Sequence, residues 1–142
     1  MRALFLLLVG CAGADYTGTW TVQSAEFVTN DCADDGNALP TGTFSILADK
    51  TQIEIDFGNG IDPIDCDRNG KAFTCDEEEF WSDIQGSARL ETAFTPSGTL
   101  GSELQATLTG TTSCEGADCA TLEGLGDVRY PCAMVIDFTA TL

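Results

Sequence analysis

The chain of 142 residues contains no histidine, and basic residues are scarce, with 6 Lys and Arg against 23 Asp and Glu. Without histidine it cannot form a Ser-His-Asp or Cys-His catalytic centre, or a zinc or haem site that needs histidine ligands. A formal net charge of −17 at pH 7 also argues against binding phosphate groups, so we expect no nucleic-acid partner. The same charge opposes adsorption to anionic lipid headgroups.

Long apolar runs are absent except at the start of the chain. There, Arg2 precedes the apolar segment 3–9, which is too short to span a bilayer and is typical of an export signal. We therefore predict a signal peptide at residues 1–10. Residues 11–142 are expected to form a single domain, because this length suits one domain.

Residues Leu8-Val9-Gly10-Cys11 at the end of this segment resemble the lipobox of bacterial lipoproteins. The resemblance implies that a lipid is attached to the Cys11 thiol and that cleavage makes Cys11 the new N-terminus. The protein would then lie in the bacterial cell envelope, held at the outer membrane or cell surface by a lipid anchor. The alternative is an ordinary secreted protein, cleaved after the small residues Ala12-Gly13-Ala14.

The cysteines other than Cys11 are expected to form structural disulfides. Their number is even, their spacing lacks the C-x-x-C pattern of zinc and redox sites, and acidic neighbours disfavour a reactive thiolate. Three disulfides fit an oxidising compartment, but six cysteines allow fifteen pairings, and the sequence does not select one. The residues concerned are Cys32, Cys66, Cys75, Cys114, Cys119 and Cys132.

The rest of the chain has the pattern of β-strands. Segment 52–57 alternates polar and apolar residues strictly, no segment shows capped helical periodicity, and the 18 threonines suit the exposed side of a sheet. We predict an all-β fold, an up-and-down antiparallel meander of about eight strands. It would close into a barrel or, alternatively, form a β-sandwich. The strands are expected at residues 17–27, 42–48, 51–57, 61–67, 71–75, 87–95, 99–110 and 132–142.

Turn residues separate these segments, notably Asn69-Gly70 and Thr95-Pro96-Ser97-Gly98. Residues 28–41, 76–86 and 111–131 are predicted to be long loops. Three of the six cysteines lie in these loops and two lie directly beside them, so disulfides would fasten the loops.

Residues Gly18-Thr19-Trp20 resemble the Gly-x-Trp element of lipocalins. That resemblance implies an eight-stranded barrel in which Trp20 closes one end and the interior holds a small apolar ligand. The chain departs from the family in ending at its last strand, where lipocalins have a helix.

Residues 65–76 resemble a calcium-binding loop, with oxygen donors at Asp65, Asp67, Asn69 and Asp76 and a glycine at the turn. The alternative is a plain hairpin turned at Asn69-Gly70. In the predicted register of that hairpin, Cys66 lies opposite Phe73 and Ile64 opposite Cys75, and all four share one face.

These features favour a membrane-anchored lipoprotein with a non-enzymatic role in binding or envelope structure, with neither catalytic residues nor a cofactor other than the calcium ion just described. The alternative function is a small secreted hydrolase that uses carboxylates, recognisable by a polar cleft with two converging acids. A carrier of a small apolar ligand would show an internal cavity. The residues expected to line it are Phe44, Ile46, Ile53, Ile55, Phe73 and Phe138.

Overall fold

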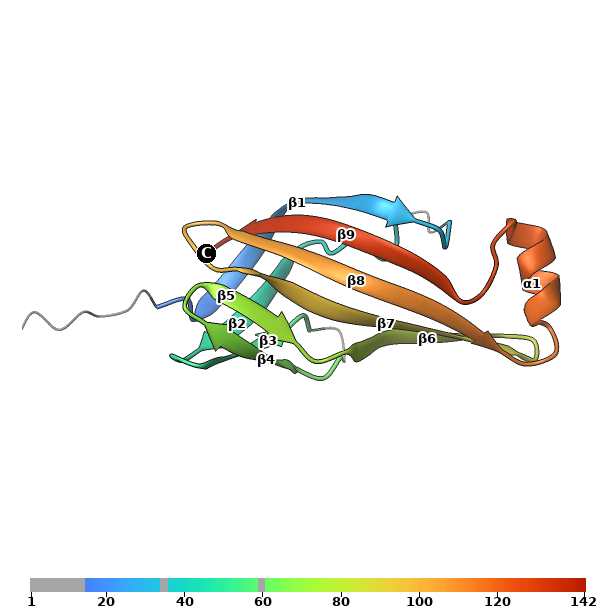
Figure 1. The fold of residues 1–142 in the computed structure, drawn as a ribbon, viewed down its shortest axis with the longest axis horizontal. Helices are drawn as coiled ribbons and strands as arrows, with labels where there is room; N and C mark the ends of the chain where they lie inside the picture. Colours follow the sequence, from blue (N-terminus) through green and yellow to red (C-terminus); the bar gives the residue numbers. More distant parts are fainter. Residues whose placement is uncertain (1–14, 34–35, 59–60) are drawn as a thin grey trace, which may run out of the picture.

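Figure 1 shows the computed structural model, which describes residues 15–33, 36–58 and 61–142. The fold is all-β, as predicted, with one short helix near the C-terminus. Its elements are β1 (Gly18–Asn30), β2 (Thr43–Ala48), β3 (Gln52–Asp56), β4 (Ile64–Asn69), β5 (Ala72–Cys75), β6 (Glu78–Gln85), β7 (Ala88–Thr99), β8 (Leu104–Glu115), α1 (Cys119–Gly126) and β9 (Cys132–Thr141). No helix among these residues has the length and apolar character needed to cross a bilayer.

The strands form a closed antiparallel barrel. Strands β1 to β5 pair in sequence order, β5 pairs with β7, and β7, β8 and β9 lead back to β1. Eight strands therefore close the barrel, which confirms the barrel prediction over the sandwich. The ninth strand, β6, pairs with β7 beyond the end of β5. The long strands continue past the barrel as a curved sheet with α1 at its far end (Figure 1).

The turn predicted at Thr95-Pro96-Ser97-Gly98 is wrong, because these residues lie inside β7 and the chain turns at 100–103 instead. Proline has no backbone N–H to donate. Within a sheet it is therefore tolerated only where that N–H would not pair with a neighbouring strand. Pro96 has such a position on one edge of β7, where the pairing changes from Phe94 with Glu78 of β6 to Ser97 with Thr74 of β5.

Other expectations about local structure were also wrong, including the long loop predicted at 111–131, which contains the end of β8 and the helix α1. Segment 76–86 is not a long loop, since β6 occupies most of it and pairs with β7. In the β4–β5 hairpin, Cys66 lies opposite Cys75 rather than Phe73, because the turn is made by Gly70 and Lys71. Gly70 has φ 64°, a left-handed conformation that glycine adopts without strain. The predicted face is unchanged, with both cysteines and Phe73 buried.

One end of the barrel is filled by side chains, and we call it the closed end. Trp20 is 1% exposed, and its indole N–H donates to the Tyr16 carbonyl oxygen at 3.0 Å. The Arg68 guanidinium lies 4.9 Å from the centroid of the Tyr16 ring, and its Nε donates to the Gly70 carbonyl oxygen at 2.7 Å. Arg68 also donates to the carbonyl oxygen of Asp49. These contacts join β1 to the β2–β3 and β4–β5 turns.

All six cysteines beyond Cys11 are paired, as predicted. Cys32–Cys132 joins the chain just after β1 to the start of β9, across 100 residues of sequence. Cys66–Cys75 crosslinks the β4–β5 hairpin, and Cys114–Cys119 joins the end of β8 to the start of α1. The first disulfide closes a long loop of chain and the other two close short ones.

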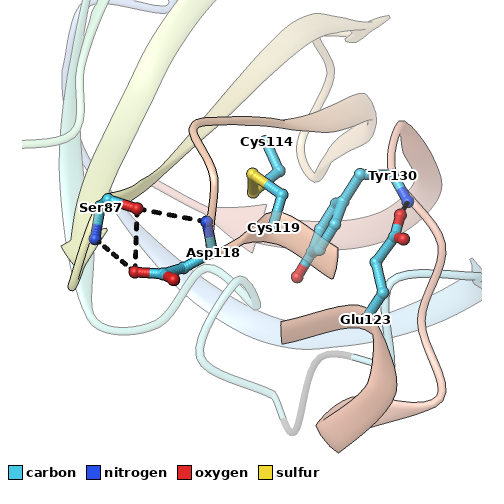
Figure 2. Close-up of a disulfide and its surroundings, with 6 residues drawn as sticks. All are labelled: Ser87, Cys114, Asp118, Cys119, Glu123 and Tyr130. Carbon is cyan, nitrogen blue, oxygen red and sulfur yellow. Dashed lines mark hydrogen bonds between the residues drawn. A yellow bond between two sulfur atoms is a disulfide. The ribbon is translucent and has the colours of Figure 1, made fainter. Parts of the chain in front are cut away.

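Helix α1 is held by its ends rather than by an apolar face, since none of its residues is buried. Figure 2 shows the Cys114–Cys119 disulfide beside the Asp118 carboxylate, which accepts hydrogen bonds from the backbone N–H and the hydroxyl of Ser87 at 2.8 and 2.9 Å. The Glu123 carboxylate accepts the Tyr130 backbone N–H at 2.9 Å. An isolated helix of this length is unstable in water, so the fastening is what maintains it.

We expect the free energy of unfolding to rise as pH falls from 7 to about 5. The many carboxylates repel one another in the folded protein, and protonation begins to remove their charge over this range. Below about pH 4 the trend should reverse. Hydrogen bonds from the backbone of Thr51 and Gln52 lower the pKa of Asp49 from its usual 3.8, and those from Ser87 lower the pKa of Asp118 in the same way. A carboxylate with a lowered pKa stabilises the fold above the unfolded pKa, and that contribution is lost as pH falls through the folded value.

Urea denaturation between pH 3 and 7 measures this dependence. The paired replacement Asp49→Asn and Asp118→Asn should weaken the fall below pH 4 while leaving the rise between pH 7 and 5 intact. Stability that declines steadily from pH 7 would contradict the repulsion argument.

Candidate functional site

The opposite end of the barrel, which we call the mouth, contains a cavity of about 180 Å³ that is lined by both apolar side chains and polar groups. It lies where β2 begins and β3 ends, beneath the segment 37–41 that connects β1 to β2. Strands β1, β7 and β8 form its walls. Its lining residues are Val22, Asn37, Ala38, Leu39, Pro40, Thr41, Thr43, Phe44, Phe57, Ile61, Phe94 and Leu108.

Three phenylalanines, Phe44, Phe57 and Phe94, are among the residues that line the cavity. The rings of Phe44 and Phe57 lie with centroids 5.3 Å apart, and Phe44 also makes an edge contact with Phe138 at 6.0 Å. Phe94 is fully buried opposite Gly110 of β8, where an added Cβ would come within 2.2 Å of its ring. Glycine at position 110 therefore leaves the space that the Phe94 ring occupies.

The connection between β1 and β2, which contains residues 37–41, is fastened near both of its ends. The Cys32–Cys132 disulfide fixes its start, and the Val22 backbone N–H donates to the Gly42 carbonyl oxygen at 2.9 Å at its end. A turn between Gly36 and Leu39, with an N–H to carbonyl hydrogen bond of 3.1 Å, places Ala38 against the core. Residues 34–35 of this connection lie outside the described part of the chain.

The cavity is smaller than the interior predicted for a carrier. Of the six residues expected to line it, only Phe44 does so. The other five, namely Ile46, Ile53, Ile55, Phe73 and Phe138, are buried in the packed core. An eight-stranded barrel is only just wide enough for its side chains to fill it, and here they fill the half nearest the closed end.

The residues proposed for calcium lie along an extended hairpin. Asp65, Asp67 and Asn69 alternate with the buried face of β4 and point outward, and the Asp76 backbone donates to the Asp65 carbonyl oxygen. Asp65 and Asn69 are four residues apart on a strand, about 13 Å, whereas a calcium ion needs oxygens within ~2.6 Å. Within the described residues, no group of three or more cysteines and carboxylates is placed to hold a metal ion. Calcium binding here remains a prediction.

Two carboxylates do face each other, on the outside of the barrel. Glu26 of β1 is paired directly with Asp137 of β9, beside a shallow groove in the outer surface. Both side chains are exposed, and the Thr107 hydroxyl donates to Asp137 at 2.6 Å. The groove is open to solvent.

The sequence did not single out most of the mouth residues, because Leu39, Phe57, Phe94 and Leu108 come from separate elements that only barrel closure brings together. A partial signal was the length of segment 28–41. Cys11, the predicted lipid attachment residue, lies outside the described residues. No protein-family model matches the chain, and comparisons with curated proteins and with solved structures found no significant match.

Proposed function

We propose that the protein is an exported lipoprotein, anchored through Cys11, whose barrel mouth binds a small apolar molecule without catalysing a reaction. The observation that carries the binding role is the cavity of about 180 Å³, lined in part by phenylalanines, at the mouth of an otherwise packed barrel. The export role is supported by the predicted signal peptide at residues 1–10. It is also supported by the pairing of six cysteines, because Cys11 is the one cysteine outside the three disulfides.

The cavity supports a ligand with few atoms. An apolar cavity of ~150 Å³ in another protein is large enough for benzene, so about 180 Å³ suits one ring or a short alkyl chain. The described lining residues carry no charged side chain, and Asp56 and Asp62 flank the nearby β3–β4 connection. A neutral ligand is therefore favoured over a carboxylate such as a fatty acid, which the acidic surface would repel.

Calorimetric titration with n-hexanol and with hexanoate at pH 7 tests this proposal. We expect n-hexanol to bind with a Kd on the order of 1 mM, as its small size allows. Hexanoate should bind about ten-fold more weakly, because of charge repulsion. Equal affinity for both compounds would contradict the charge argument, and binding of neither would remove the cavity as a ligand site.

A matched pair of variants locates the binding. Leu39→Trp places a larger side chain in the cavity lining and should abolish hexanol binding. Leu47→Trp makes the same change on the outer surface of β2, where the side chain is 59% exposed, and should leave binding unchanged. Thermal melting shows whether each variant is folded, and hexanol binding that survives Leu39→Trp in a folded protein would place the site elsewhere.

A further inference from the structure

The scarce basic residues of the body gather at the closed end. Of the five that remain after Arg2 is set aside, Lys50 lies in the β2–β3 turn, Lys71 in the β4–β5 turn and Arg68 beside it. Hydrogen bonds join these turns to their neighbours, with the Arg68 backbone donating to the Thr51 carbonyl oxygen at 2.7 Å and the Leu100 backbone to the Lys71 carbonyl oxygen at 2.8 Å. Both lysine side chains are exposed.

The charge of the molecule is therefore distributed unevenly along its length. We define the closed-end surface as residues 15–18, 48–51, 68–71 and 100–103, which carry the three basic residues and three acidic ones, Asp15, Asp49 and Glu103. The remaining body holds two basic residues, Arg89 and Arg129, and 20 acidic ones. Hence the charged side chains of the closed-end surface sum to zero, whereas those of the remaining body are strongly negative in total.

The position of Cys11 places this same surface next to the anchor. Four residues separate Cys11 from Tyr16, so the tether reaches at most about 18 Å. The start of β1 lies at the closed end, and α1 lies at the opposite end of the long axis (Figure 1). Strand β7 runs from beside α1 to the closed end, and its 12 residues span about 40 Å.

From these observations we infer that the closed-end surface docks on the anionic bilayer that holds the anchor, and that the mouth and α1 point away from it. The inference rests on the lipid anchor of the proposed function. Electrostatic forces from a membrane surface fall off within about 8 Å at physiological ionic strength. The residues nearest the lipid therefore decide the orientation, and the net charge of the whole body does not.

Docking by this end brings Lys50 and Lys71 to the headgroups together with the three acidic residues of the same surface, and it keeps the far more acidic walls away from the headgroups. A lysine close to an anionic surface shifts such an equilibrium by about five-fold. The mouth then faces the aqueous phase, from which a ligand enters without crossing lipid.

Lysine acetylation tests the orientation directly, because Lys50 and Lys71 are the only lysines in the sequence. The protein with its native anchor is bound to vesicles of phosphatidylcholine alone, or of phosphatidylcholine and phosphatidylglycerol at about three to one. An uncharged acetylating reagent is added, and labelling rates are read by mass spectrometry. On the anionic vesicles we expect both lysines to react about five-fold more slowly than on the neutral ones. High salt should remove the difference.

The Arg129→Lys variant supplies a matched control, since it places a lysine near α1 without changing the charge. Lys50 and Lys71 should be protected on anionic vesicles and the introduced lysine should not. Equal protection of all three would mean that the body lies on its side, and protection of none would mean that no surface docks; either result overturns the inference. If the native chain proves not to be acylated, the proposed function fails separately. Coupling the Cys11 thiol to a maleimide lipid then tests the orientation alone.

Discussion

Replacing Cys11 with Ser should transfer the protein from the detergent phase to the aqueous phase. The body has no helix able to cross a bilayer within its described residues, and its charge is strongly negative. In the proposed lipoprotein the acyl chains on Cys11 provide the membrane retention, and each of their methylenes contributes ~0.8 kcal/mol when buried. Loss of the acceptor thiol removes all of that free energy, so we expect complete loss of retention and of lipid incorporation. Phase partitioning and intact-mass measurement detect these two losses.

The fold should survive this change, because Cys11 is not one of the six cysteines paired in the barrel. Exported variant protein should therefore contain three disulfides and bind n-hexanol like the unaltered protein. Alkylation in denaturant without reductant should label none of the six. If the unaltered protein instead begins at Asp15 and stays in the aqueous phase, the lipobox interpretation is wrong and an ordinary secretory signal replaces it.

Removing the Cys32–Cys132 disulfide should cause the largest loss of stability among the three. In the chain-entropy model a closed loop of ~100 residues contributes about 4–5 kcal/mol, whereas a loop of about six residues contributes roughly 2 kcal/mol. The first value applies to Cys32–Cys132 and the second to Cys114–Cys119. We expect the Cys32→Ala and Cys132→Ala double variant to lower the Tm by about 10–20 °C.

The matched comparison is the Cys114→Ala and Cys119→Ala double variant, measured by the same thermal melts. It should lower the Tm by less than half as much, since it releases α1, which buries none of its residues. The first variant should also weaken hexanol binding because it frees the segment over the mouth. Equal losses of Tm in the two variants would show that native-state strain or packing, and not chain entropy, determines the contribution of each disulfide.

The polar and apolar alternation of the chain determined its class and most of its strands. A strand such as 52–57 shows one face to the core and one to solvent, and this period of two is local information. The even number of cysteines beyond Cys11 likewise predicted that all six would be paired. The sequence could not choose among the pairings, because Cys32 and Cys132 meet only once β1 and β9 close the barrel.

The tertiary structure alone decided the elements that lack strong local signals. Acidic residues at 76–79 are typical of a solvated loop, yet β6 forms there because β7 offers an unpaired edge beyond the end of β5. Helix α1 contains Gly124 and has poor helical propensity, and it forms because a disulfide and hydrogen bonds to Asp118 and Glu123 hold its ends.

The candidate site follows the same division. Phenylalanines and a long first connection were visible in the sequence, but the cavity arises where side chains from four strands and two connections fail to fill the mouth. The sum of charges gave the sign of the electrostatic field and suggested that anionic lipid would be avoided. Only the fold placed Lys50, Arg68 and Lys71 on one end, beside the predicted anchor. The net charge from the composition counts every charged residue equally, whatever its position. Salt screens the interaction with a membrane, so that interaction depends mainly on the charged residues nearest the lipid.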